Sequence, residues 1–125
     1  MLAVLAHLIV GFFLALTKSN HVVHLVMART PEGKVKDAVT KILRENGAYY
    51  FFPATGGYGR SGVPDIVACF RGKFFGIECK AGKGDTTTLQ DRELDKIRKA
   101  GGVALVIHEH TVHIIAGYLK LLGEK

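Results

Sequence analysis

The chain has little cysteine, and that excludes two classes of small protein. Its 125 residues include two cysteines, Cys69 and Cys79. Two are too few for a disulfide framework, and they lack the spacing of a zinc finger. Both lie in apolar runs that predict strands. We therefore expect two small buried side chains in a reducing compartment.

Internal repeats and low-complexity segments are also missing. With 48% hydrophobic and 22% charged residues, the composition is that of a globular protein rather than a disordered one. A chain of 125 residues has room for one domain with a modest core. Positive charge is in excess, because 17 Lys and Arg face 11 Asp and Glu. This excess is compatible with an anionic partner, commonly nucleic acid.

Residues 1–26 differ from the rest of the chain. Residues 2–16 (LAVLAHLIVGFFLAL) are apolar apart from His7, and no Asp or Glu precedes Met27. The run is shorter than the about 20 residues that span a bilayer, and it lacks the basic start and clear cleavage site of a secretory signal. We interpret residues 1–26 as an extension upstream of a true start at Met27. A membrane anchor and an extra packed helix are the alternatives.

Residues 27–125 predict one domain. Thr30-Pro31-Glu32 is a helix-start signal, and Asn46-Gly47 ends that helix. Later segments predict, in order, strands at 48–52, 64–70 and 73–80, a helix at 87–100, a strand at 103–108, and a helix at 111–122 whose first residues could instead extend the strand. The order α-β-β-β-α-β-α predicts an α/β fold, a mixed central sheet of about four strands flanked by helices.

Three charged side chains gather on the predicted hairpin. Alternation along a strand places Glu78 and Lys80 on one face. If Arg71 and Gly72 form a two-residue turn, Asp65 lies opposite Glu78, with Cβ atoms about 4.5–5.5 Å apart. Carboxylates so close repel each other unless a proton or a cation lies between them. A divalent metal would use both as ligands, and oxygen ligation favours Mg²⁺ or Mn²⁺ over zinc.

This set of groups suits phosphodiester hydrolysis. A bound metal polarises the phosphate and lowers the pKa of a bound water. Lys80 is placed to hold that water and to offset charge growing on the phosphate. The alternative is an ordinary surface hairpin with a Glu–Lys pair. Against it, Glu78 lies in an apolar strand (FFGIEC), where an ionised side chain is costly.

Two further polar side chains are predicted to point inward. Glu32 lies at helical spacing from Val35 and Val39, on or near the buried side of the first helix. Gln90 shares a helix face with Leu94, and a buried amide needs hydrogen-bond partners. Gln90 is either a satisfied structural residue near the helix end or a polar group that orders the metal site.

Residues in two loops are candidates for DNA contact. The glycine-rich loop 55–62 (TGGYGRSG) carries Tyr58 and Arg60. Arg60 can contact a phosphate, and Tyr58 can stack on a base or pack internally. Lys83, in the loop after the second hairpin strand, is either another phosphate contact or a solvated lysine.

The segment 62–66 (GVPDI), the run Glu78-Cys79-Lys80, Gln90 and the pair Ala100-Gly101 together resemble the PD-(D/E)XK nuclease superfamily. The chain is most similar to its small stand-alone VRR-NUC domains, which resemble archaeal-type Holliday-junction resolvases. The resemblance covers about residues 30–122 and implies a restriction-endonuclease-like core. It also implies roles for individual residues: catalysis by Asp65, Glu78, Lys80 and Gln90, and metal binding by Glu32, Asp65, Glu78 and the backbone carbonyl of Cys79.

The function implied by this resemblance is that of a Mg²⁺- or Mn²⁺-dependent DNA endonuclease that leaves a 5′-phosphate. The expected substrate is branched DNA such as a four-way junction, cut by a homodimer in the cytoplasm of a bacterial or phage-infected cell. A restriction- or repair-type nuclease on duplex or flap DNA is an alternative. So is an inactive DNA-binding module, although intact Asp65, Glu78 and Lys80 argue against it. A membrane role depends on residues 2–16 alone.

Overall fold

The computed structural model describes residues 29–124 of the chain. The three interpretations of residues 1–26, as an upstream extension before Met27, a membrane anchor or an extra helix, lie outside the described residues. Within residues 29–124, no helix combines the length and apolar character that crossing a membrane requires.

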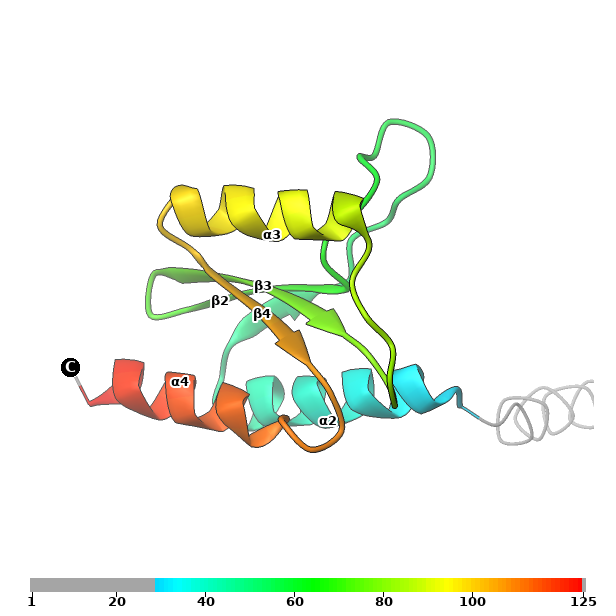
Figure 1. Ribbon diagram of the computed structural model, residues 1–125. Coiled ribbons are helices and arrows are strands. Elements are labelled where there is room, and N and C mark those ends of the chain that lie inside the picture. The colour runs from blue at the N-terminus through cyan, green and yellow to red at the C-terminus, as the bar shows by residue number, and fades with distance from the viewer. Residues whose placement is uncertain (1–28, 125) are drawn as a thin grey trace, which may run out of the picture.

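A four-stranded sheet forms the middle of three layers (Figure 1). Helix α3 covers one face, and helices α2 and α4 cover the other. In spatial order the strands are β1 (Tyr49–Phe51), β2 (Ile66–Phe70), β3 (Lys73–Cys79) and β4 (Val103–Ile107). The helices are α2 (Pro31–Glu45), α3 (Thr88–Lys99) and α4 (His113–Gly123). The predicted order and the mixed α/β fold are confirmed.

The strands pair in both directions. β1 with β2 and β2 with β3 are antiparallel, whereas β3 with β4 is parallel. A parallel pair needs a crossover connection, and α3 supplies it. The final helix α4 begins at His113, so the alternative in which those residues extend β4 is not realised.

The main core lies between the sheet and the layer of α2 and α4. Thr30 starts α2, where its side-chain oxygen accepts a hydrogen bond from the Gly33 N–H at 3.1 Å. The apolar face of α2 then packs on one side of the sheet and on α4. The cluster comprises Val35, Val39, Leu43, Ala48, Ile66, Ala68, Phe75, Ile77, Cys79, Ile107, Ile115 and Leu119. Each large apolar side chain buried here contributes roughly 1.5–3 kcal/mol.

The hairpin turn fixes the register of β2 and β3. Arg71 and Gly72 have φ values of 47° and 77°, as in the two-residue turns with positive φ that match the twist of a hairpin. Ile66 pairs with Ile77. The two-residue turn expected from the sequence is therefore confirmed. Asp65, which directly precedes the paired Ile66, lies beside Glu78.

Helix α3 runs back along β3 on the opposite face of the sheet. Its Leu94 is buried, and Ile97 lies over two glycines. A Cβ added to Gly102 would lie 2.8 Å from Ile97 Cγ2, so the missing side chain lets the helix approach closely. This packing brings the first turn of α3 to the carboxyl end of β3.

The expectation of two buried cysteines is half right. Cys79 is buried in the core, but Cys69 is exposed. Cys69 pairs with Tyr49 on one side and Phe74 on the other, and these neighbours are 70% and 44% exposed. This row of the sheet is at most partly covered. An apolar run predicted the strand correctly without showing which part of it a helix covers.

Candidate active site

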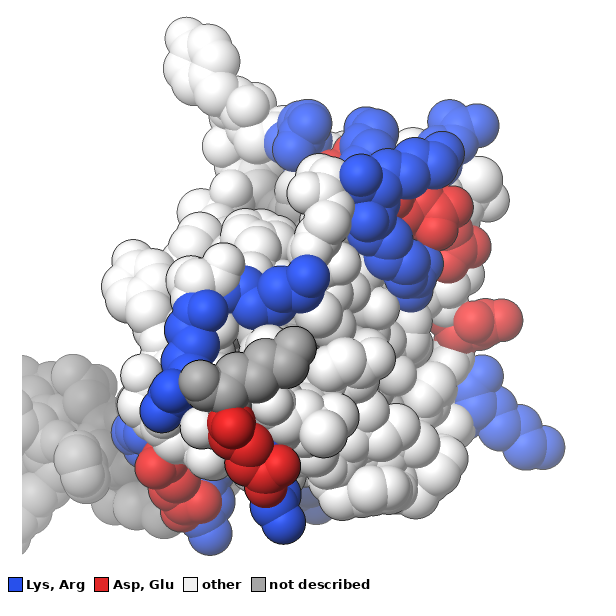
Figure 2. Space-filling view, turned by 90° about the vertical axis from the view of Figure 1, so that its left-hand side faces the viewer, with Lys and Arg blue, Asp and Glu red and all other residues white. Residues whose placement is uncertain are grey.

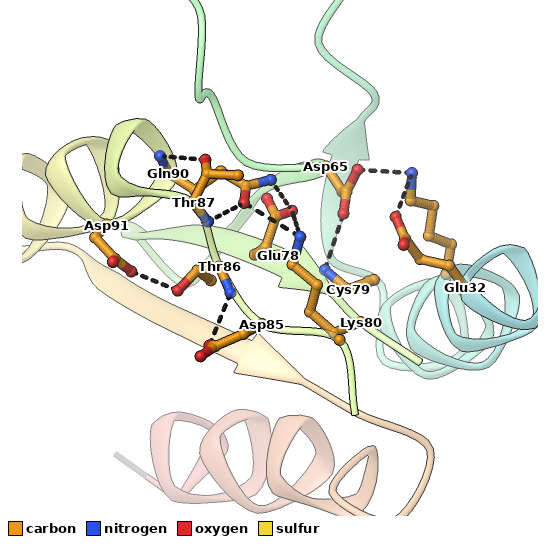
Figure 3. A network of polar contacts seen from close by, with 12 residues as sticks. Glu32, Asp65, Glu78, Cys79, Lys80, Asp85, Thr86, Thr87, Gln90 and Asp91 are labelled. Carbon is orange, nitrogen blue, oxygen red and sulfur yellow. Dashed lines mark hydrogen bonds and ion pairs between the residues drawn. The ribbon is translucent and has the colours of Figure 1, made fainter. Parts of the chain in front are cut away.

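Polar side chains from four parts of the fold meet at one end of the sheet (Figure 3). Asp65 directly precedes β2, and Glu78 and Lys80 lie at the carboxyl end of β3. Gln90 lies in the first turn of α3 and Glu32 in the first turn of α2. Residues far apart in the sequence are thus brought to one place by the pairing of β2 with β3 and by the two helices packed on opposite faces.

The position of Asp65 is fixed by the backbone of the neighbouring strand. The Cys79 N–H donates a hydrogen bond to Asp65 Oδ2 at 2.9 Å. The Asp65 side chain is 18% exposed, so one edge of it still reaches solvent. A carboxylate held by the backbone in this way is already oriented before any ligand arrives.

Glu78 is a buried acid, with only 2% of its surface exposed. Its Oε1 lies 3.2 Å from Lys80 Nζ and also accepts a hydrogen bond from Gln90 Nε2. Burial, and next the negative charge of Asp65, raise the pKa of Glu78, while Lys80 acts in the opposite direction. A carboxyl group with a raised pKa and a second acid beside it favours a proton or a cation between the two.

Gln90 has two roles. In the capping box of α3, the Thr87 side chain accepts from the Gln90 N–H, and the Thr87 N–H donates to Gln90 Oε1 at 2.8 Å. The same amide oxygen accepts from Lys80 Nζ at 3.1 Å, and the amide nitrogen donates to Glu78. Gln90 therefore caps the start of α3 and also bridges Glu78 and Lys80, while its role in ordering a metal site stays a prediction.

Gly62 allows the loop before Asp65 to pack against the start of α3. Gly62 has φ 79°, and a Cβ there would lie 2.5 Å from the Leu89 carbonyl carbon and 2.9 Å from the Gln90 nitrogen. Positive φ and the close backbone contact both require glycine. The loop that leads to Asp65 and the helix that carries Gln90 are thereby held together.

Lys36 lies among the candidate site residues, and sequence reasoning did not place it there. Helical periodicity assigns it to the polar outer face of α2 with the neighbouring lysines. Instead its Nζ lies 2.6 Å from Asp65 Oδ1. Burial acts to lower the pKa of Lys36, but the hydrogen bond and charge of Asp65, together with Glu32, outweigh it and raise the pKa. The signal available in the sequence was its position one turn after Glu32.

Glu32 is less buried than expected, since its side chain is 43% exposed. It faces Lys36, with 3.9 Å between Glu32 Oε1 and Lys36 Nζ. Its role as a metal ligand stays a prediction. Among residues 29–124, no three His, Cys, Asp or Glu side chains form a group that could hold a metal.

The donors at Asp65 and Glu78 nonetheless have the chemistry of a site for a hard cation. Two carboxylates face each other across the hairpin, and the charge of one raises the pKa of the other. With the backbone carbonyl of Cys79 as a third candidate, all donors are oxygens, which suit Mg²⁺ or Mn²⁺. The Cys79 thiol does not compete as a nucleophile, because burial, and next the charge of Asp65, raise its pKa to about 12.

The three residues expected to contact DNA lie in different settings. Tyr58 is fully exposed in its loop. Arg60 is paired, with its Nη2 3.5 Å from Glu93 Oε2. Glu93 is a buried acid of α3 that also binds Lys96 at 2.6 Å. The ion pair gives the glycine-rich loop a second attachment to α3, which the sequence did not reveal.

The loop that carries Lys83 is tied to the end of β4. The Gly82 N–H donates to Glu109 Oε1 at 2.9 Å, and His108 Nε2 lies 3.0 Å from the Gly84 carbonyl oxygen. Hydrogen bonds from its own backbone and from Gly82 lower the pKa of Glu109. Lys83 is exposed between these two anchors, close in sequence to Lys80.

Comparison with known proteins defines the class. Residues 33–113 match the family described as archaeal Holliday junction resolvase (hjc). The match spans most of the chain, and the chain belongs to this family. It is also similar to a solved structure titled "VRR_NUC domain", with 22% sequence identity and a TM-score of 0.55 over 76% of this chain and 92% of that one. At this identity the likeness shows the fold alone. No curated protein matches the sequence.

Family and fold agree with the class expected from the sequence. The resemblance to PD-(D/E)XK nucleases is confirmed by the family, and the predicted VRR-NUC-like fold by the solved structure. Family membership supports a nuclease that acts on DNA.

Proposed function

We propose that the chain is a divalent-metal-dependent endonuclease that hydrolyses phosphodiester bonds in branched DNA such as four-way junctions. The name of its family supports branched DNA as the substrate. The chemistry rests on one observation. Glu78 is buried beside Asp65 and contacts the polar side chains of Lys80 and Gln90.

Asp65 and Glu78 are the proposed metal ligands, together with the backbone carbonyl of Cys79. Glu32 is the proposed fourth donor, contributed by α2. Mg²⁺ or Mn²⁺ suits such an all-oxygen set. When bound, the metal supplies Lewis acidity toward the phosphate and a water of lowered pKa. The protein contributes the orientation of the ligands, since Asp65 is held by the Cys79 N–H and Glu78 by Gln90.

Lys80 is the proposed catalytic lysine. Its Nζ lies 3.2 Å from Glu78 Oε1 and 3.1 Å from Gln90 Oε1, so two acceptors from different elements fix its position. An ammonium group held in this way offsets negative charge that develops on the phosphate and donates a hydrogen bond to the attacking water. Gln90 is the proposed positioning residue, because it contacts both Glu78 and Lys80.

The proposed DNA contacts are Tyr58, Arg60 and Lys83. A fully exposed tyrosine can stack on a base, and arginine and lysine can contact phosphates. Figure 2 shows further Lys and Arg side chains at the level of α3, with Asp and Glu side chains among them, and Lys96 and Arg98 pair with Glu93 and Asp95. The formal net charge of +6 favours a polyanionic substrate.

A homodimer is the proposed active form, because two sites can then cut paired strands of one junction. The alternative within the same chemistry is a nuclease on duplex or flap DNA. An inactive DNA-binding module is the alternative from another class, and the intact set Asp65, Glu78 and Lys80 argues against it.

The test is a cleavage assay on labelled DNA of different shapes. The purified chain is incubated with a synthetic four-way junction, a flap and a plain duplex of matched sequence, with Mg²⁺, Mn²⁺ or EDTA. We expect paired cuts in the junction, no product in EDTA, and slow cutting of the plain duplex. The Lys80→Met variant should bind the junction and leave it intact.

The possible outcomes separate the candidate functions. Cleavage that persists in EDTA contradicts the metal mechanism. Equal cutting of all three substrates supports the duplex or flap nuclease. Tight binding without product in either metal supports the binding module. Sedimentation of the protein alone and with the junction tests the dimer.

A further inference from the structure

A lysine from α2 lies on the carboxylate that is proposed to bind the metal. Lys36 Nζ lies 2.6 Å from Asp65 Oδ1 and 3.9 Å from Glu32 Oε1. The family resemblance assigns no role to this residue. The ammonium group lies between two of the three side chains that are the proposed ligands of the cation.

Both oxygens of Asp65 are already engaged in this arrangement. Oδ2 accepts from the Cys79 N–H at 2.9 Å, and Oδ1 faces Lys36. Oδ2 is held by the backbone of β3, whereas Oδ1 pairs with a flexible side chain. A metal ion that binds Oδ1 therefore has to compete with Lys36.

The two lysines near Asp65 and Glu78 differ in burial and in their number of hydrogen-bond acceptors. Lys80 is 12% exposed and has two acceptors, Glu78 and Gln90. Lys36 is 32% exposed and projects from the surface of a helix. A lysine ammonium on a flexible four-carbon stem can turn into solvent without moving the backbone. Lys36 is thus the cation that can leave.

The balance of charge favours such an exchange. In the absence of metal, three carboxylates (Glu32, Asp65 and Glu78) face two ammonium groups. Removal of Lys36 would leave two uncompensated negative charges close together, which repel each other. A divalent cation at Asp65 Oδ1 brings two positive charges where Lys36 brings one, so it offsets the negative charge of the carboxylates more fully.

We infer that Lys36 is an internal counter-ion that holds Asp65 in the metal-free protein and competes with the divalent cation for it. The inference rests on the proposed metal site. Lys36 keeps the acidic site together before metal binds, and it lowers the apparent affinity for the metal because its contact with Asp65 must be broken.

The test measures Mn²⁺ binding by titration calorimetry without DNA, and thermal melting in EDTA and in Mn²⁺. The variants are Lys36→Met, which removes the charge and keeps the aliphatic stem, and Lys36→Arg, which keeps the charge. Lys34→Met is the matched control. Lys34 is an exposed lysine of the same helix for which no ion pair occurs within residues 29–124.

We expect Lys36→Met to bind Mn²⁺ about tenfold more tightly than wild type, because a positive charge a few ångströms from the cation is removed. Its melting temperature in EDTA should be lower than that of wild type, and Mn²⁺ should raise that temperature by more. Lys36→Arg and Lys34→Met should bind within about twofold of wild type, a free-energy change well below that of a tenfold shift. If Lys36→Met is unfolded in EDTA, Lys36→Gln, which retains a polar group, takes its place.

Two different results overturn the inference. Affinity of Lys36→Met equal to or weaker than that of wild type, with wild type binding Mn²⁺, shows that Lys36 does not compete and leaves the proposed metal site intact. Absence of Mn²⁺ binding by wild type and by every variant removes the metal site, and with it the role of Lys36.

Discussion

Neighbouring residues of β3 face two environments that are equally buried and chemically opposite. Ile77 and Cys79 are 0% exposed and lie in the apolar cluster with α2 and α4. Glu78 lies between them in sequence, is 2% exposed, and contacts Lys80 and Gln90 on the α3 side. Burial stabilises the fold on one face. On the other it raises the pKa of an acid, at the position where we propose a cation site.

The largest effect is expected for Glu78→Gln, which keeps the shape of the side chain and removes its charge. Single-turnover cleavage of a four-way junction should fall about a thousandfold or more, since an electrostatic contribution to catalysis is lost. The melting temperature in EDTA should stay equal to that of wild type or rise, because a costly buried charge is gone. A large loss of stability would mean that Glu78 belongs to the structural face.

The next effect concerns the adjacent residue on the apolar face. Ile77→Ala should lower the free energy of unfolding by about 2–5 kcal/mol, because a fully buried side chain leaves a cavity. Urea denaturation measures the loss. Cleavage per folded molecule should stay close to the wild-type rate. A rate loss as large as that of Glu78→Gln would contradict the assignment of one face to stability and the other to catalysis.

A smaller effect is expected at the start of α3. Gln90→Ala should slow cleavage by about 10- to 100-fold, as loss of a partner that orients a ligand commonly does. Thr87→Ala is the control, because it removes the other half of the capping box and should cost about 1 kcal/mol of stability. If Thr87→Ala slows cleavage as much as Gln90→Ala, Gln90 acts only through the helix start.

The smallest effect concerns pH in the absence of metal. The pKa of Glu78 is raised in the folded protein. Protonated Glu78 therefore contributes to stability. This contribution is fully present below the pKa of Glu78 in the unfolded chain and is lost as pH rises through its pKa in the folded protein. In EDTA, wild type should lose more stability than Glu78→Gln between acidic and neutral pH, as measured by melting. Parallel pH profiles of the two proteins would contradict the raised pKa.

Local periodicity was enough to predict how several side chains of the candidate site lie relative to one another. Strand alternation places Glu78 and Lys80 together, and a two-residue turn places Asp65 opposite Glu78. The inward direction of Gln90 follows from the helical repeat of α3. Each of these inferences depends on residues within one element or one hairpin, where the backbone geometry is regular.

The remaining features depend on how separate elements pack. Lys36 reaches Asp65 because α2 packs on the face of the sheet beside Asp65, which the helical repeat of α2 does not encode. The pairing of Arg60 with Glu93 depends on the path of a glycine-rich loop. The exposure of Cys69 depends on how much of the sheet the helices cover. Periodicity gives the face of a residue within its own element and leaves open what lies opposite that face.

The central claim is that Asp65 and Glu78 form a cation site at the polar end of the sheet. Titration calorimetry of Mn²⁺ into wild type and into Glu78→Gln, with no DNA present, tests it most directly. We predict binding of a single cation per chain by wild type, and loss of most of that affinity in Glu78→Gln. Equal binding by the two proteins, or no binding by wild type, would contradict the account.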